Sequence, residues 1–387
     1  MRLSLITMLL FALTTGLTQA QAELPKCQDR PTWIDPPWVN GFEWCLELVL
    51  RDDSAGELGY TALAAAPDGT LYAARPNTGE ILLLTDEDGD DLPETPRIVA
   101  GGLTMPNGLT FYDEHLYISG AQHIYLMDSD FRVETLVDDL PWGAGFWTGS
   151  LMIGPDERIY IAIGATCDYC EQADTTRGSI WSYALDGSDP QQIDIGLRQP
   201  GDVAFRDGVL WTLDSARDDL NLTDLDEINR VTEGANFGWP YCFGADNQPD
   251  SLAGTFDCAQ AVAPALTLPT HSTPIRLETY NSDTLPGIEN DLLVVLHGSY
   301  NQSDLQGYAL ALVQFDDHGN PSGYRVIIPE QTIHPNQQSS YIYPLAEIQY
   351  QESGFWPHRP LDVTVSREGW IYVSVGGGQI FVLRPLV

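Results

Sequence analysis

Six stretches of the chain share one pattern, in which a polar turn is followed by a run of alternating residues. They read APDGTLYAAR (66–75), YDEHLYISGA (112–121), GPDERIYIAIGA (154–165), RDGVLWTLDS (206–215), IENDLLVVLHGS (288–299) and SREGWIYVSVGG (366–377). Alternation of apolar and polar residues is typical of a β-strand, and the preceding turn residues favour a hairpin. The pattern therefore predicts six related hairpins.

The spacing of these hairpins indicates the architecture. Their anchor residues lie 45, 43, 51, 82 and 79 residues apart and are Tyr72, Tyr117, Tyr160, Trp211, Leu293 and Tyr372. A period of about 40–50 residues accommodates four short strands, which form one propeller blade. We therefore expect an all-β, six-bladed β-propeller with insertions at about 213–270 and 300–358, in which Trp44–Leu50 completes the last blade. Two β-sandwiches are the alternative, but they do not explain the regular repeat.

The first residues have the form of a secretory signal. Met1-Arg2 precedes an apolar run from Leu3 to Leu17, and Ala20-Gln21-Ala22 matches an A-x-A cleavage site. We expect residues 1–22 to be removed and residues 23–387 to form a single propeller domain in the periplasm or outside the cell. No later stretch approaches the roughly 20 apolar residues of a membrane span.

The six cysteines favour three disulfides, because an even number of cysteines in an oxidising compartment is typical of disulfide-bonded proteins. Proximity suggests the pairs Cys27–Cys45, Cys167–Cys170 and Cys242–Cys258, although spacing alone leaves other pairings open. A zinc or redox role for the C-x-x-C at 167–170 is less consistent with the sequence, since the chain has no second C-x-x-C.

The net charge of −37, from 18 Lys and Arg against 55 Asp and Glu, argues against nucleic acid and anionic membranes as partners. The chain has one lysine, Lys26. An anionic ligand must therefore be held by arginine, histidine or backbone N–H groups.

Repeat position predicts which residues meet at the mouth of the central channel. Five arginines recur there: Arg75, Arg198, Arg217, Arg276 and Arg359. Their planar guanidinium groups suit the carboxylates or phosphates of a ligand. The alternative is that each arginine pairs with one of the abundant carboxylates of the protein itself.

Several motifs resemble the soluble glucose/sorbosone dehydrogenase family. They are GATCDYCEQ (164–172), GLRQPGDVAF (196–205), RDDLNLTDLDEINRVTEGANFGWPYCFG (217–244), LPTHSTPIRL (268–277) and LVVLHGSYNQSDLQGY (293–308), and the similarity extends from about residue 44 to 384. The resemblance implies a six-bladed propeller that uses pyrroloquinoline quinone (PQQ) and Ca²⁺ to oxidise an aldose or a related alcohol or aldehyde. The electron acceptor stays unidentified. PQQ is a tricarboxylate, so an arginine-rich mouth suits it.

The resemblance assigns roles to individual residues. Arg198 matches an arginine beside the quinone, with Gln199 where an asparagine is usual, and Arg359 matches an arginine that holds a PQQ carboxylate. His297 falls at a cofactor contact, and Asn107 is a further cofactor-binding candidate because it lies on the predicted rim. The backbone carbonyls of Ala216 and Arg217 match the turn that binds the active-site Ca²⁺.

The stretch WGAGFWTGSL (142–151) departs from the family pattern. In the family, the turn that is Gly154-Pro155-Asp156 here is preceded by a histidine that acts as general base. Phe146 stands there and cannot accept a proton. His297 and His358 are candidate substitute bases because both belong to the predicted rim, whereas His271 is predicted to be more remote. A propeller that binds a sugar, an anion or a partner protein without catalysis is the alternative.

A second Ca²⁺ site is a further hypothesis. TDEDGDDLPE (85–94) places Asp86, Asp88, Asp90 and Glu94 at the alternating spacing of a Ca²⁺ loop, although it is not an EF-hand. A plain acidic turn is the other interpretation. A lactonase-like metal hydrolase fits less well, because the predicted rim is mostly basic or apolar.

Overall fold

The computed structural model describes residues 27–34, 39, 44–217, 225–244, 246, 248–254, 256–300, 305–329 and 355–386. Their regular structure consists of strands and three short 3-10 helices, η1 (Cys27–Asp29), η2 (Asp53–Ala55) and η3 (Cys258–Gln260). The predicted signal sequence lies outside the described residues. No helix in the described ranges has the length and apolar character that crossing a membrane requires.

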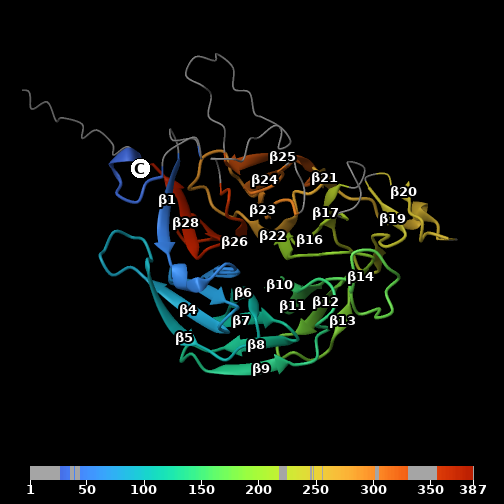
Figure 1. Ribbon diagram of the computed structural model, residues 1–387, viewed down its shortest axis with the longest axis horizontal. Helices are drawn as coiled ribbons and strands as arrows, with labels where there is room; N and C mark the ends of the chain where they lie inside the picture. The colour runs from blue at the N-terminus through green and yellow to red at the C-terminus, as the bar shows by residue number, and fades with distance from the viewer. Residues whose placement is uncertain are drawn as a thin grey trace, which may run out of the picture.

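Six antiparallel sheets of four strands are arranged around a central axis, as Figure 1 shows. Blade 1 contains β2 (Ala62–Ala65), β3 (Leu71–Arg75), β4 (Glu80–Thr85) and β5 (Thr95–Ala100). Blade 2 contains β6 (Pro106–Tyr112), β7 (His115–Gly120), β8 (His123–Met127) and β9 (Val133–Val137). Blade 3 contains β10 (Thr148–Ile153), β11 (Arg158–Ile163), β12 (Ser179–Ala184) and β13 (Gln191–Gln192).

The second half of the ring repeats this arrangement. Blade 4 contains β15 (Val203–Arg206), β16 (Val209–Asp214), β17 (Asp226–Arg230) and β21 (Leu266–Leu268). Blade 5 contains β22 (Pro274–Thr279), β23 (Leu292–Leu296), β24 (Ala309–Phe315) and β25 (Pro321–Ile328). Blade 6 contains β26 (Pro360–Val365), β27 (Ile371–Val375), β28 (Gln379–Pro385) and β1 (Trp44–Arg51). The predicted all-β, six-bladed propeller is confirmed.

The first strand of the chain closes the ring. β1 pairs with β28 in antiparallel register from Trp44↔Pro385 to Arg51↔Gln379, and Figure 1 shows the two strands side by side in blue and red. The prediction that Trp44–Leu50 completes the last blade is therefore confirmed. Glu47 lies fully buried on β1, where Arg384 of β28 and Arg30 both donate hydrogen bonds to its carboxylate.

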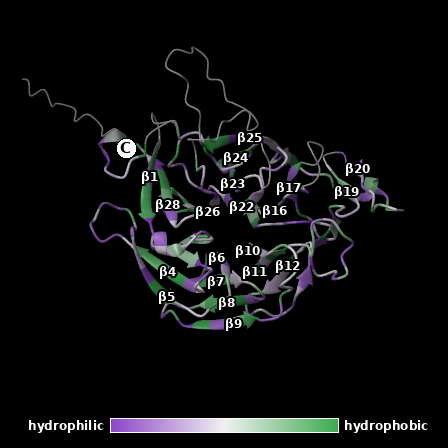
Figure 2. Cartoon of the chain, viewed as in Figure 1, coloured by the Kyte–Doolittle hydropathy of each residue, from purple (hydrophilic) through white to green (hydrophobic). Residues whose placement is uncertain are grey.

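The alternating pattern produces a core between each pair of neighbouring blades. The six anchor residues all lie on the second strand of a blade, and the buried apolar residues form six clusters, one for each interface between blades. Hydrophobic residues run along strands such as β1 and β25 in Figure 2. Each fully buried Leu, Ile or Val contributes about 1.5–3 kcal/mol to folding.

The stretch between β17 and β21 adds structure outside the repeat. The short strand β14 (Asp194–Ile195) pairs in parallel with β18 (Ala235–Asn236), and β19 (Cys242–Phe243) pairs with β20 (Gln248–Pro249). The Cys242–Cys258 disulfide closes this insertion, while Cys27–Cys45 ties η1 to β1 and Cys167–Cys170 closes a loop after β11. The pairing suggested by proximity is therefore the one in the structure.

Candidate active site

One residue from each blade lines a cavity at the centre of the ring. These residues hold equivalent positions near the start of the innermost strands and are Thr61, Asn107, Gly149, Gly201, Ile275 and Leu361. In blades 2, 3, 5 and 6 this position lies within a register shift between the innermost strand and its neighbour. Such β-bulges redirect side chains next to a site. The cavity has a volume of about 520 Å³, which suits a small-molecule ligand.

Hydrogen bonds join each blade to the next around this cavity. The donor–acceptor pairs are Thr61 Oγ1 to Pro106 O (3.2 Å), Asn107 Nδ2 to Thr148 O (3.1 Å), Ser150 N to Gly201 O (3.1 Å), Ser215 Oγ to Pro274 O (3.1 Å), His297 Nδ1 to Pro360 O (2.9 Å) and Leu63 N to Asp362 Oδ2 (2.5 Å). Because every junction between blades has such a bond, the cavity wall is held in place before any ligand enters.

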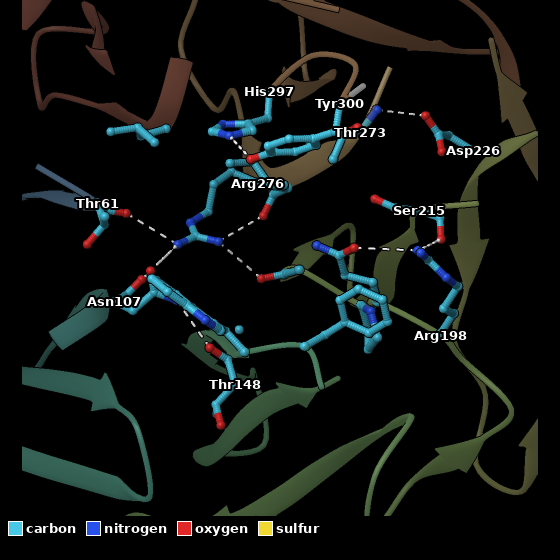
Figure 3. Close-up of a pocket in the computed structure, with 18 of the residues that line it drawn as sticks. Thr61, Asn107, Thr148, Arg198, Ser215, Asp226, Thr273, Arg276, His297 and Tyr300 are labelled. Atoms are coloured by element: carbon cyan, nitrogen blue, oxygen red, sulfur yellow. Dashed lines mark hydrogen bonds between the residues drawn. The ribbon is translucent and has the colours of Figure 1, made fainter. Parts of the chain in front are cut away.

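Arg276 forms the floor of the cavity (Figure 3). Its Nη2 donates to Asn107 O (2.8 Å), Asn107 Oδ1 (3.0 Å) and Thr61 O (3.2 Å), and its Nη1 donates to Ile275 O (2.9 Å). Its Nε lies 3.4 Å from Asp362. The guanidinium group therefore links blades 1, 2, 5 and 6 across the channel, and both of its terminal nitrogens donate to protein acceptors.

Three carboxyl groups lie along the channel, and Arg276 interacts with two of them, Asp202 and Asp362. Burial raises the pKa of Asp202 to about 7 and that of Asp362 to about 6, although the Arg276 charge acts in the opposite direction. Glu278 follows one layer further along β22. Burial, together with the charges of Asp202 and Asp362, raises its pKa to about 8. Because the channel has three carboxyl groups and one arginine, some of these carboxyl groups keep their proton at neutral pH.

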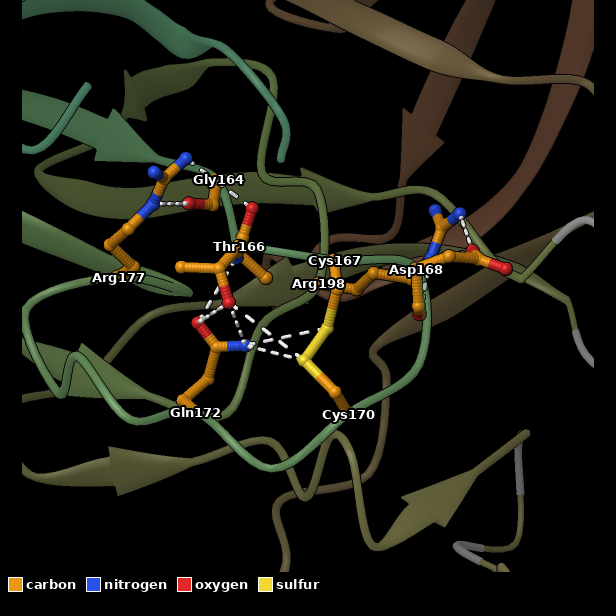
Figure 4. Close-up of a disulfide and its surroundings, with 9 residues drawn as sticks. Gly164, Thr166, Cys167, Asp168, Cys170, Gln172, Arg177 and Arg198 are labelled. Carbon is orange, nitrogen blue, oxygen red and sulfur yellow. Dashed lines mark hydrogen bonds and ion pairs between the residues drawn. A yellow bond between two sulfur atoms is a disulfide. The ribbon is translucent and has the colours of Figure 1, made fainter. Parts of the chain in front are cut away.

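A second arginine, Arg198, lines the side wall. Its guanidinium group pairs with the carboxylate of Asp168, donates from Nη1 to Ser215 O (2.8 Å) and lies 4.4 Å from the ring centroid of Phe146. Figure 4 shows that Asp168 comes from the loop closed by the Cys167–Cys170 disulfide. The disulfide loop therefore supplies the carboxylate that offsets the positive charge of Arg198 on this wall.

The segment at 142–151 forms an aromatic wall beside Arg198, whose guanidinium group lies over the Phe146 ring. Phe146 N donates to Ala165 O (2.9 Å), and the buried Arg177 donates from Nη2 to Phe146 O (2.7 Å). Gly145 has φ +86°, and a Cβ there would approach Ala165 O within 2.1 Å, so only glycine fits. Trp147 lines the cavity and stays 43% exposed. This segment therefore presents an aromatic surface with no proton acceptor.

Asp226 holds the opposite edge of the cavity. The carboxylate accepts from Ala216 N (2.8 Å) on one oxygen and from Ser272 Oγ and Thr273 N (2.7 Å each) on the other. Burial raises its pKa to about 6 despite these donors. One aspartate thus fixes both the Ser215-Ala216 turn and the loop between β21 and β22. The spacing of the repeat gave no signal for this residue.

His297 is a neutral hydrogen-bonding residue. Pro360 O can only accept, so His297 Nδ1 carries the proton, and Nε2 accepts from the Tyr300 hydroxyl at 2.7 Å. Burial and the nearby Arg359 charge lower the pKa of His297 to about 4. Both ring nitrogens are therefore engaged at neutral pH.

The structure brings together some of the predicted site residues. Those that line the cavity are Asn107, Phe146, Arg198, Gln199, Ala216 and His297. His358 lies instead in a separate depression beside Glu57 and Gly377, whereas His271 lines the cavity. The predicted positions of these two histidines are therefore exchanged, because the loop between β21 and β22 folds inward.

Arg217 and Arg359 stand behind the cavity wall. Arg217 pairs with Asp250 and lies 3.5 Å from the Tyr169 ring centroid. Arg359 donates to the backbone carbonyls of residues 297–299 and lies 4.2 Å from the Tyr300 ring centroid. In the described part of the chain, Arg359 forms no ion pair, whereas Arg75, Arg198, Arg217 and Arg276 each face a carboxylate.

The acidic loop after β4 gathers four carboxylates. One oxygen each from Asp86, Asp88, Asp90 and Glu94 lies within 4.8 Å of the others. Burial, together with the charges of Asp88 and Asp86, raises the pKa of Asp90. Backbone N–H groups also donate to these carboxylates, for example Gly89 N to Asp86 at 2.7 Å. This Ca²⁺ site stays a prediction.

Comparison with known proteins identifies the family. The model of the TrAA12-like family matches residues 172–385, more than half of the chain. The chain belongs to the TrAA12-like family. Quinoprotein glucose dehydrogenase B of Acinetobacter calcoaceticus is 26% identical to this TrAA12-like protein over 247 residues, which are 47% of this chain and 50% of that enzyme. The chain thus matches half the length of this curated relative. The resemblance to soluble quinoprotein sugar dehydrogenases is confirmed.

Solved structures share the fold of the TrAA12-like protein at low sequence identity. The calcium structure of a Trichoderma reesei family AA12 protein has a TM-score of 0.73 and 18% identity, covering 92% of this chain and 98% of that one. The holo PQQ domain of pyranose dehydrogenase from Coprinopsis cinerea has a TM-score of 0.71 and 17% identity, covering 92% and 99%. At such identities these similarities show the fold alone.

The cavity of the TrAA12-like protein combines positive charge with flat apolar faces, which suits a planar polycarboxylate, although Arg276 already donates to backbone carbonyls and Arg198 already pairs with Asp168. Arg198 and Arg276 both line it, in a protein of net charge −37. The Gln199 side-chain amide also lines it, and its Nε2 has no hydrogen-bond partner in the described ranges. Phe146 and Trp147 offer flat apolar faces. The site offers fewer free ligand oxygens to Ca²⁺. Ser215 O, beside the predicted Ala216-Arg217 turn, already accepts a hydrogen bond from Arg198.

Proposed function

We propose that this protein is a PQQ-dependent oxidoreductase that converts a sugar or a related alcohol or aldehyde. The cavity carries the proposal, since it combines two arginines, a free amide and an aromatic wall at the centre of a propeller from this family. The names of relatives support it, because they include a quinoprotein glucose dehydrogenase and a pyranose dehydrogenase PQQ domain.

Individual residues would hold PQQ through charge and shape. Arg198 and the Gln199 amide would face its carboxylates, while Arg359 would add positive potential from behind Tyr300. When bound, the quinone would supply a two-electron acceptor for hydride. Ca²⁺ would lie against the backbone of Ala216, where Asp226 holds the turn.

The remaining walls suit an uncharged sugar ring. The faces of Trp147 and Phe146 would pack against the C–H groups of the ring, and the polar residues Thr148 and Asn107 also line the cavity. The net charge of −37 would repel an anionic substrate at low ionic strength. We therefore propose a neutral aldose or a related neutral alcohol. We also propose that the protein is exported, from the character of residues 1–22.

Binding of PQQ tests the proposal directly. Saturating PQQ with Ca²⁺ should raise the melting temperature, because a ligand at about 100 times its Kd stabilises the folded state by about 2.7 kcal/mol. Arg198→Gln should reduce this shift. The control Arg132→Gln, at an exposed ion pair with Asp130, should keep it. An unchanged melting temperature in the wild-type protein would contradict the function.

The alternative is a propeller that binds without reacting, which the replacement of the family histidine by Phe146 favours. Dye reduction dependent on both sugar and PQQ supports the oxidoreductase. Tight PQQ and sugar binding without dye reduction, even in Phe146→His, supports the binding protein instead.

A further inference from the structure

We propose that His271 takes the proton from the substrate hydroxyl in this site. The proposal rests on the proposed oxidoreductase function, which needs a base where the family histidine is replaced by Phe146. It goes beyond the sequence, which pointed to His297 and His358.

The other titratable groups of the cavity are already engaged. The guanidinium groups of Arg198 and Arg276 cannot accept a proton. Asp226 receives three hydrogen bonds, from Ala216 N, Ser272 Oγ and Thr273 N. His297 uses both ring nitrogens, one towards Pro360 O and one towards the Tyr300 hydroxyl. Each of these groups would have to break an existing interaction before it could serve a substrate.

His271 differs from these groups in its surroundings. It lines the cavity, yet neither ring nitrogen forms a hydrogen bond within the described residues. Its side chain is partly exposed, in contrast to the buried His297. An imidazole with an unengaged nitrogen at a ligand cavity has the geometry that a general base requires. His358 lacks this position, because it faces a different depression.

The backbone around His271 has an unusual conformation that fixes where its side chain starts. His271 has φ +66° and Thr273 has φ +51°, conformations that non-glycine residues seldom adopt. Such residues cost about 1–3 kcal/mol each and persist where the surroundings impose them. Here Asp226 accepts hydrogen bonds from both Ser272 Oγ and Thr273 N, the two residues directly after His271, and so anchors this part of the loop. Asp226 is thus the positioning residue of the loop.

The step balances as follows. With PQQ bound, the quinone would supply the acceptor for the hydride that leaves the broken substrate C–H bond, while an imidazole nitrogen of His271 would accept the proton of the broken O–H bond. The carbon–oxygen bond becomes a carbonyl. The imidazolium ion then returns its proton to water, which its partial exposure permits.

The first test needs no cofactor. In the NMR spectrum of the protein without PQQ, the ring signal of His271, assigned with His271→Gln, should shift when a neutral aldose is added. The ring signal of His318, in the exposed turn between β24 and β25, is the control and should not shift. A His271 signal unmoved by aldoses that the holoenzyme oxidises would overturn the proposal.

The second test uses the holoenzyme. His271→Gln should lower kcat for dye reduction by about 10²–10⁴-fold, the usual contribution of a general base, while the melting shift caused by PQQ stays that of the wild type. His318→Gln should keep full activity. Introducing Phe146→His into the His271→Gln protein should restore part of the loss, because it returns a base to the family position.

The outcomes separate the two proposals. A normal PQQ-induced melting shift with kcat within about tenfold of the wild type in His271→Gln would overturn the role of His271 and leave the oxidoreductase standing. A wild-type protein that does not bind PQQ would overturn the function and the role together.

Discussion

His297 and His271 reach the same cavity by different routes. His297 directly follows the second strand of a blade, so the spacing of the repeat predicted its place. His271 lies between β21 and β22 in backbone of positive φ, and Asp226, on a strand 45 residues earlier in the chain, binds the two residues that follow it. No local pattern encodes that contact, which is why the sequence placed His271 too far away and gave no role to Asp226.

At the residue scale, Glu278 should make stability depend on pH. Its pKa in the folded protein is raised to about 8, whereas an unfolded glutamate titrates at about 4.3. Between these values the folded state keeps a proton that the unfolded chain has lost, so stability falls as pH rises through this window. Glu278→Gln should therefore raise the free energy of unfolding at pH 9 by about 1–2 kcal/mol, a value reduced because the side chain is only partly shielded.

Urea unfolding at pH 4 and pH 9 measures this effect. The gain of Glu278→Gln should be smallest at pH 4, and the exposed Glu233→Gln should change little at either pH. If Glu278→Gln is no more stable than the wild type at pH 9, the pKa of Glu278 is not raised in the folded protein.

At the scale of elements, the strands were predictable and their irregularities were not. The alternation of apolar and polar residues located the second strand of every blade and the closing strand β1, because each of these strands buries one of its faces. The bulges at Asn107 and Ile275 depend on how neighbouring blades meet, and the pairing of β14 with β18 joins the stretch between β17 and β21 to a strand about 40 residues earlier in the chain. These features place the cavity residues, yet they leave no periodic signal.

The junction of β1 and β28 yields a prediction about stability. Glu47 is fully buried between Arg30 and Arg384, and loss of its charge would leave two partly buried guanidinium groups without their carboxylate. Glu47→Gln should lower the free energy of unfolding by about 3 kcal/mol at neutral pH. Asp130→Asn, at the exposed Arg132 pair, should cost less than about 1 kcal/mol in the same denaturation experiment. Equal effects of the two substitutions would argue against a role for Glu47 in closure.

At the scale of the whole molecule, charge should dominate the response to salt. The chain has a net charge of −37, so repulsion between like charges opposes the compact state. The Debye length falls from about 30 Å at 0.01 M to about 3 Å at 1 M salt. Raising NaCl across this range should therefore raise the melting temperature. A flat or falling melting temperature would mean that the local ion pairs outweigh the repulsion.

The pairing of β1 with β28 also sets an order of assembly. Residues 44–51 and 379–385 are more than 300 residues apart, yet they share one sheet. A growing chain makes β1 early and cannot pair it until the last three strands of the sixth sheet exist. Closing so long a loop adds only a few kcal/mol of entropy, because this cost grows with the logarithm of its length. The strands that are synthesised last therefore fix the strand that is synthesised first. Until they pair, the ring is open and two sheet edges lack hydrogen-bond partners.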